Sequence, residues 1–115
     1  MRRAVTVALA AVVLALALVV SASAGSTRTV KVGDDYYGPT KMTVNRGTTI
    51  RWTWLSDNAD SHDVKLSSAP KGVRKFHSAS AATDYTFKRT LKVPGTYKLV
   101  CTLHQDMTMR VVVRH

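Results

Sequence analysis

The sequence predicts an all-β domain, a sandwich or a small barrel, that follows an N-terminal export signal. Short segments show the period-2 alternation of apolar and polar residues that strands have, and turn-forming residues separate them. No segment of the mature part has a convincing helical period. The chain has 115 residues, and 91 of them (115 − 24) follow the leader, so we expect one domain and exclude a large multidomain enzyme.

The first 24 residues have the composition of a signal peptide. Residues 1–3 are Met-Arg-Arg, residues 4–20 are apolar apart from Thr6, and residues 22–24 are Ala-Ser-Ala, the small-residue pattern that signal peptidase recognises. We therefore expect cleavage after Ala24 and a soluble mature domain, residues 25–115, in the periplasm, the cell envelope or the extracellular space. An uncleaved membrane anchor is the alternative.

We expect six or seven short strands. In chain order the candidate segments are residues 29–32, 41–44, 48–55, 62–66, 84–91, 97–101 and 109–114. The clearest is the third, in which Thr48, Ile50, Trp52 and Trp54 fall on one face and mostly polar residues fall on the other. Two Trp side chains on one face supply much of the core that a small domain needs.

Turn-forming residues separate these strands. Residues 33–35 (Gly-Asp-Asp) follow the first strand, and residues 38–39 (Gly-Pro) break the chain before the second. Residues 45–47 (Asn-Arg-Gly) have the composition of a short hairpin loop, and residues 94–95 (Pro-Gly) suit the centre of a type II turn. For residues 67–82, rich in Ser, Ala, Lys and Gly, we expect a loop with room for one helical turn.

The chemistry is concentrated in one local cluster, Cys101, His104 and Met107, spaced C-x2-H-x2-M where one strand ends and the next begins. The single Cys cannot form a disulfide within the chain, and a small exported domain usually needs a disulfide or a metal. A thiolate and a thioether together select copper over zinc. With one further His, the cluster becomes the donor set of a blue-copper electron-transfer site.

His62 is the expected second imidazole, because it begins a strand after a polar loop and can lie at the same end of the fold as the cluster. We expect His77 to be a surface residue. Met109 competes with Met107 for the role of axial ligand, but it alternates in register with Val111 and Val113, which favours core packing. We also expect Met42 to lie in the core.

Three stretches of the chain resemble cupredoxins, most closely the plastocyanin, amicyanin and pseudoazurin-like branch. Residues 95–107 (GTYKLVCTLHQDM) resemble the strand and loop that carry the copper ligands, and residues 47–52 leading to His62 resemble the strands that deliver the first His. Residues 76–97 resemble the stretch between the ligands. The resemblance covers residues 30–113 and implies a Greek-key β-sandwich in which His62, Cys101, His104 and Met107 hold one copper ion.

The resemblance implies an exported type 1 copper protein, not an enzyme, that shuttles single electrons between redox partners. In the family the C-terminal His ligand reaches the surface through an apolar patch, which implies His104 as the electron port and Leu103 as part of the patch. The residue after the first His is often Asn in the family, whereas here it is Asp63. The alternative function is copper delivery or storage without electron traffic, and a Cys-His nucleophilic enzyme is a third.

The mature domain is strongly basic. Without Arg2 and Arg3 it has 15 Lys and Arg (17 − 2) and seven acidic residues, all Asp, which gives a charge of +8 (15 − 7). Because of this charge we expect redox partners that are acidic at the docking surface, or binding to an anionic envelope surface. We also expect the protein to be a monomer. Nucleic acid is not expected, because interleaved basic and aromatic motifs are absent from this sequence.

Overall fold

The computed structural model describes residues 3–5, 8, 10 and 25–115. Most of the expected signal peptide, residues 1–24, lies outside the described residues, so its cleavage stays a prediction. The described part of the chain contains eight strands and no helix, and therefore no helix that is long and apolar enough to cross a membrane. The expected all-β class is confirmed.

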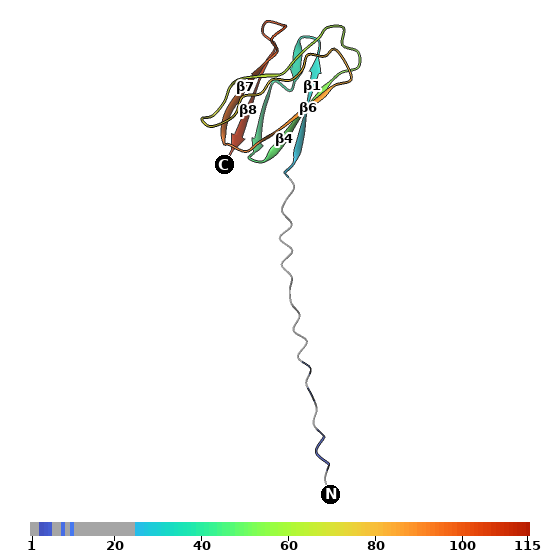
Figure 1. Ribbon diagram of the computed structural model, residues 1–115, viewed down its shortest axis with the longest axis vertical. Coiled ribbons are helices and arrows are strands. Elements are labelled where there is room, and N and C mark those ends of the chain that lie inside the picture. Colours follow the sequence, from blue (N-terminus) through green and yellow to red (C-terminus); the bar gives the residue numbers. More distant parts are fainter. Residues whose placement is uncertain (1–2, 6–7, 9, 11–24) are drawn as a thin grey trace.

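The strands form two four-stranded sheets (Figure 1). The first sheet has the order β2-β1-β4-β6 and consists of β1 (Thr27–Gly33), β2 (Tyr36–Gly38), β4 (Thr48–Trp54) and β6 (Thr86–Leu91). The second has the order β3-β8-β7-β5 and consists of β3 (Lys41–Asn45), β5 (Lys65–Ser68), β7 (Gly95–Val100) and β8 (Thr108–Arg114). From β2 to β7 the chain changes sheet at every connection, which is how a Greek-key sandwich is wound.

Two connections differ from the expectation. Residues 45–47 do not close a hairpin, because β3 pairs in parallel with β8 and β4 pairs in parallel with β1, in different sheets. The amide of Arg46 donates to Arg114 and that of Gly47 to Leu91, so the segment bridges the sheets. Gly95 has the expected positive φ of 135°. It is, however, the first residue of β7, at the end of a connection that leads from β6 in one sheet to β7 in the other. Alternation along one strand carries no information about which strand it pairs with.

Three local expectations also change. The strand expected over residues 62–66 begins at Lys65, and His62 instead forms an isolated bridge with Ala81. No helical turn forms within residues 67–82. The short strand β2, which pairs antiparallel with β1, was not expected because its sequence, Tyr-Tyr-Gly, is too short to alternate.

The core lies between the two sheets, and the alternation expected for β4 is confirmed. Thr48, Ile50, Trp52 and Trp54 are all buried, and Ile50 and Trp52 are completely so. Met42 and Met109 are buried too, as expected. The packing of these inward faces fixes the register of the strands, since a slip of one residue would turn each apolar face outward.

One end of the sandwich gathers the loops that matter for function. Strands β1, β4 and β7 end there and β6 and β8 begin there, as the parallel and antiparallel pairings require. We call this end the loop end and define it by four segments, residues 34–40, 55–64, 79–85 and 101–107. Hydrogen bonds join these segments: Ala59 donates its amide to Asp34, and Asn58 donates its side-chain amide to Ala82.

Candidate metal centre

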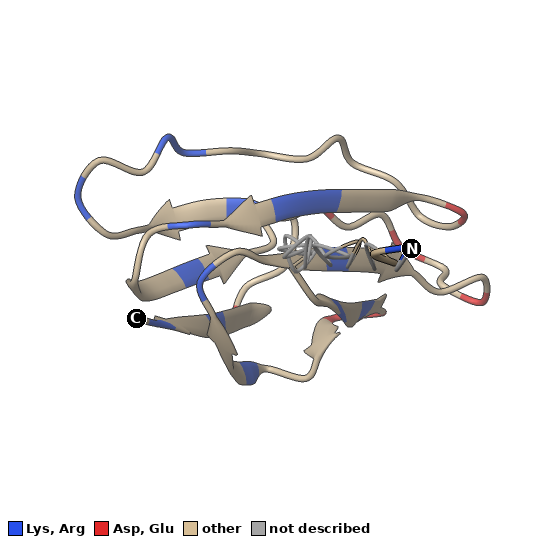
Figure 2. Cartoon of the chain, turned by 90° about the horizontal axis from the view of Figure 1, so that it is seen from below, with Lys and Arg blue, Asp and Glu red and all other residues tan. Residues whose placement is uncertain are grey.

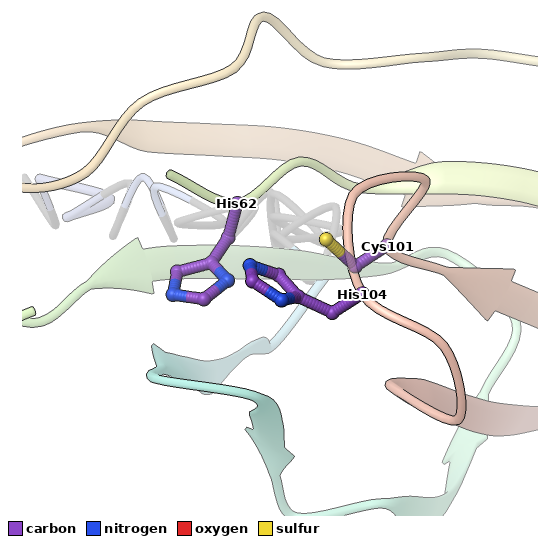
Figure 3. A group of neighbouring side chains, drawn as sticks. All are labelled: His62, Cys101 and His104. Atoms are coloured by element: carbon purple, nitrogen blue, oxygen red, sulfur yellow. The ribbon is translucent and has the colours of Figure 1, made fainter. Parts of the chain in front are cut away.

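Three side chains of the loop end point toward one another (Figure 3). His62, Cys101 and His104 each offer a ligand atom, and these atoms all lie within 4.8 Å of one another. The two imidazole rings are 4.7 Å apart between centroids. His62 and Cys101 are buried, whereas 24% of the His104 side chain is exposed. The three residues expected from the sequence as ligands, His62, Cys101 and His104, therefore meet at one point.

The position of His62 is fixed at one nitrogen of its ring and along its backbone. Its amide and carbonyl pair with Ala81, at 2.8 and 3.1 Å, and the Trp54 indole donates to the same carbonyl. The Nε2 atom is 2.9 Å from Oδ1 of Asp34. A neutral imidazole that donates from Nε2 keeps its lone pair on Nδ1. That Nδ1 atom is buried without a hydrogen-bond partner, as expected of a metal ligand.

The carboxylate of Asp34 supports this arrangement. The backbone amide of Ala59 and the side chain of His62 lower the pKa of Asp34 to about 2, together with the amide of Asp60. Asp34 is therefore ionised at neutral pH and accepts the His62 proton, which fixes the tautomer. From the sequence alone, Asp34 could be identified only as a turn residue, because 28 positions separate it from His62.

Cys101 lies at the start of a closed loop between β7 and β8. Its amide donates to the carbonyl of Met107 (2.9 Å), and the amide of Met107 donates to the carbonyl of His104 (3.4 Å). Pairing of Val100 with Thr108 completes the hairpin. Met107 is buried, with 1% of its surface exposed. The short spacing of the motif thus places one thiol, one imidazole and one thioether in a single tight loop.

A buried carboxylate, Asp63, holds this loop against the His62 segment. Oδ1 of Asp63 accepts the amide of Thr102 at 2.7 Å, and Oδ2 accepts the Thr102 hydroxyl and lies 2.8 Å from Nε2 of His77. Burial alone would raise the pKa of Asp63, but these hydrogen bonds lower it overall. His77 has 49% of its side chain exposed, so it is a surface residue as expected, yet it also supports the site.

His104 completes the cluster and faces solvent. Its Nε2 atom lies 3.0 Å from the carbonyl oxygen of Ser61, and its Nδ1 atom lies 3.1 Å from Oδ1 of Asp35. A metal bound by His104 would replace one of these two contacts. The ring is thus the most accessible of the three proposed ligands.

The two methionines occupy different environments. The sulfur of Met109 accepts a hydrogen bond from the indole of Trp52 at 3.3 Å, within the core between the sheets. Met107 belongs to the loop of Cys101 and His104. The core position expected for Met109 is confirmed, and the axial role of Met107 remains a prediction.

The donor set fits a soft or borderline metal ion. One thiol and two imidazoles converge, one imidazole nitrogen is buried and unpaired, and of these three side chains only that of His104 is partly exposed. Copper is the ion that thiolate, imidazole and thioether ligands favour together. Among the described residues, Asp34 and Asp63 then act as the hydrogen-bonding support that such ligands usually have.

Comparison with known proteins agrees with this geometry. A family model described as a cupredoxin-like domain matches residues 6–113. The chain is 32% identical over 99 residues to amicyanin-alpha of Methylorubrum extorquens, an alignment that covers 86% of this chain and 81% of that protein. A solved structure of an amicyanin mutant in the reduced state superposes with a TM-score of 0.67 at 24% identity, over 76% of this chain and 82% of the other.

A larger protein contains the same fold. A copper-containing nitrite reductase from Thermus scotoductus superposes with a TM-score of 0.64 at 20% identity. The match covers 76% of this chain but 22% of the reductase, so it concerns one domain of that enzyme and indicates the fold alone.

Proposed function

The chain belongs to the cupredoxin-like family, and we propose that it is a copper protein that carries single electrons between redox partners. The observation that carries the proposal is the convergence of His62, Cys101 and His104 at the loop end, with Nδ1 of His62 buried and unpaired. The similarity to amicyanin extends over 86% of this chain and supports the proposal for the domain as a whole.

We assign the copper ligands to His62, Cys101 and His104, with Met107 as the weak fourth ligand. Bound copper would supply a one-electron couple between its +1 and +2 states. Cys101 binds as the thiolate, and His62 binds through Nδ1 because Asp34 engages Nε2. The hydrogen bonds of Asp34 and Asp63 hold the ligand segments in one arrangement, which favours fast electron transfer because little rearrangement is needed.

Electron transfer requires a route to the surface, and His104 provides it. His62 and Cys101 are buried, whereas His104 is partly exposed and its neighbour Leu103 is 50% exposed. A partner that covers Leu103 would come within contact distance of the His104 ring. We therefore assign His104 as the port through which electrons enter and leave.

We propose that the protein is not an enzyme. Two grooves of the described residues, of about 440 and 530 Å³, are lined by other residues than His62, Cys101 and His104. An electron carrier needs no substrate pocket beside its metal. The resemblance to a nitrite reductase does not alter the proposal, since this chain spans only a fifth of that enzyme.

Copper delivery or storage is the second candidate function. A protein that releases copper needs ligands that solvent and partners can reach, and the exposed side of His104 keeps this candidate open. The burial of Cys101 and His62 favours the electron carrier. Export, cleavage after Ala24 and a monomeric state also belong to the proposal, as the sequence analysis expects.

The test is an optical and electron-spin spectrum of residues 25–115 after copper(II) is added. We expect one copper per chain, an intense thiolate-to-copper(II) charge-transfer band, and loss of that band in Cys101→Ser with the circular dichroism of the sheets unchanged. Copper(I) uptake without a coloured copper(II) form would favour delivery or storage. Absence of stoichiometric copper binding would refute both functions.

A further inference from the structure

The charges of this domain are segregated between its loop end and the rest of the sandwich (Figure 2). All seven acidic residues lie in the four segments of the loop end, and none of these segments contains a Lys or an Arg. The acidic residues are Asp34, Asp35, Asp57, Asp60, Asp63, Asp84 and Asp106. All 15 basic residues of the mature domain lie on the strands or in the remaining connections. Three of them, Lys41, Lys98 and Arg110, line one groove together with Asp106, so the acidic rim of the electron port consists of Asp35 and Asp60.

Carboxylates surround the electron port directly. A carboxylate oxygen of Asp35, one of Asp60 and a ring nitrogen of His104 lie within 4.8 Å of one another. Asp35 is 64% exposed, and Asp60 is exposed as well. A partner that approaches His104 therefore meets negative charge on its rim.

Two exposed apolar side chains lie on the same surface. Among the described residues of the mature domain, three large apolar side chains are exposed, and the two most exposed are Leu103 (50%) and Tyr36 (46%). Leu103 precedes His104 and Tyr36 follows Asp35, and the His104–Asp35 contact of 3.1 Å brings the two segments together. An apolar centre with a charged rim is the usual anatomy of a transient protein interface.

The basic residues at the opposite end are too distant to cancel this local charge at physiological salt. Arg46 and Lys92 line one shallow depression there, at the connections that follow β3 and β6. The seven residues of β4 span about 24 Å at roughly 3.4 Å per residue. The Debye length at physiological ionic strength is about 8 Å, so those charges act weakly on a partner at His104.

We propose that the loop end, centred on Leu103, Tyr36 and His104 and rimmed by Asp35 and Asp60, docks a redox protein through a basic surface with an apolar centre. This inference rests on the proposed function, because it takes His104 as the electron port. It replaces the acidic partner expected from net charge alone. Complementary charge at the rim accelerates association, and the apolar centre sets the orientation.

The kinetic test uses the copper-loaded, reduced protein and two inorganic oxidants of opposite charge. Tris(1,10-phenanthroline)cobalt(III) is the cation and hexacyanoferrate(III) the anion, and each takes one electron from the reduced copper centre. Rates are measured by stopped flow at ionic strengths from about 5 to 200 mM, after the reduction potential of each variant has been determined. If the local carboxylates govern access, the rate with the cation falls as salt rises. A rate with the cation that rises with salt would overturn the proposal.

Two double variants separate local from net charge. Asp35→Asn with Asp60→Asn removes two carboxylates at the port and should slow the reaction with the cation about tenfold at low salt, the lower end of steering effects. Arg46→Gln with Lys92→Gln removes two positive charges at the far end and should change the rate less than about twofold. If the second pair accelerates the cation reaction and the first has no effect, net charge governs and the proposal is wrong.

A binding test keeps this inference separate from the proposed function. Polylysine is titrated into the protein and its binding is mapped by amide chemical shifts, with and without copper. We expect changes at residues 35–36, 60 and 103–106, and polyglutamate should instead affect the strands and the far connections. Polylysine shifts elsewhere, or none, would overturn the docking surface. A colourless protein that still binds polylysine at these residues would refute electron carriage while retaining the surface.

Discussion

Replacement of Asp63 by Asn tests the support of the metal centre most sharply, because the two side chains have nearly the same shape. The carboxylate receives three hydrogen bonds, from the amide and hydroxyl of Thr102 and from His77. A hydrogen bond to a charged group contributes about 1.5–3 kcal/mol and a neutral one about 0.5–1.5 kcal/mol. The three bonds therefore lose about 3 kcal/mol in Asp63→Asn, and the lower cost of burying a neutral amide offsets part of this loss. We expect the free energy of unfolding to fall by about 2 kcal/mol at neutral pH.

The difference in stability between the native protein and Asp63→Asn should depend on pH. The pKa of Asp63 in the folded protein lies below its ordinary value of 3.8, so the carboxylate stabilises the fold fully above that value. Its contribution is lost as the pH falls through the lower, folded pKa. The difference in stability between the native protein and Asp63→Asn should therefore be constant down to about pH 5 and narrow below about pH 4.

The assay is urea denaturation of the metal-free domain at about pH 7, 5, 4 and 3, followed by circular dichroism. A loss of 2 kcal/mol also corresponds to a melting temperature lower by about 8–16 °C for a domain of this size. Asp84→Asn is the matched control, since Asp84 is exposed at the same end and should change stability by less than about 0.5 kcal/mol. Equal stability of Asp63→Asn and the native protein at pH 7, or a difference that persists unchanged at pH 3, would refute the reasoning.

The remaining predictions concern the ligands and their support. Met107→Leu should keep the colour and raise the reduction potential, measured by voltammetry; a shift in Met109→Leu instead would reverse the assignment. Met109→Leu should lower stability by about 1 kcal/mol in urea, because the indole of Trp52 loses its acceptor. Asp34→Ala should weaken copper binding about 10- to 100-fold in a chelator competition, since His62 loses the partner that fixes its tautomer; unchanged affinity would contradict that role.

The sequence predicted the parts of the structure that depend on local pattern. The alternation of β4 identified its buried face, and the spacing from Cys101 to Met107 identified a compact loop between two strands. It did not predict that residues 45–47 cross between sheets, because the pairing of β3 with β8 joins strands far apart in the chain. A hairpin and a crossing connection have the same short, Gly-containing composition.

The same limit applies to the metal centre. His62 and the loop from Cys101 could be found by residue type, but Asp34 and Asp63 acquire their roles from contacts across 28 and 39 positions. Net charge suggested an acidic partner, and it could not reveal that every Asp of the chain lies at one end of the sandwich. Only the fold tells which loops share a surface.

Cyclic voltammetry of the copper-loaded domain tests the central claim, that this centre transfers single electrons, most directly. We expect one reversible one-electron wave whose peak separation stays small as the scan rate rises, because the ligand segments are held in one arrangement. The wave should be absent in Cys101→Ser. Irreversible reduction with release of copper, or no wave in a protein that holds one copper per chain, would contradict electron carriage.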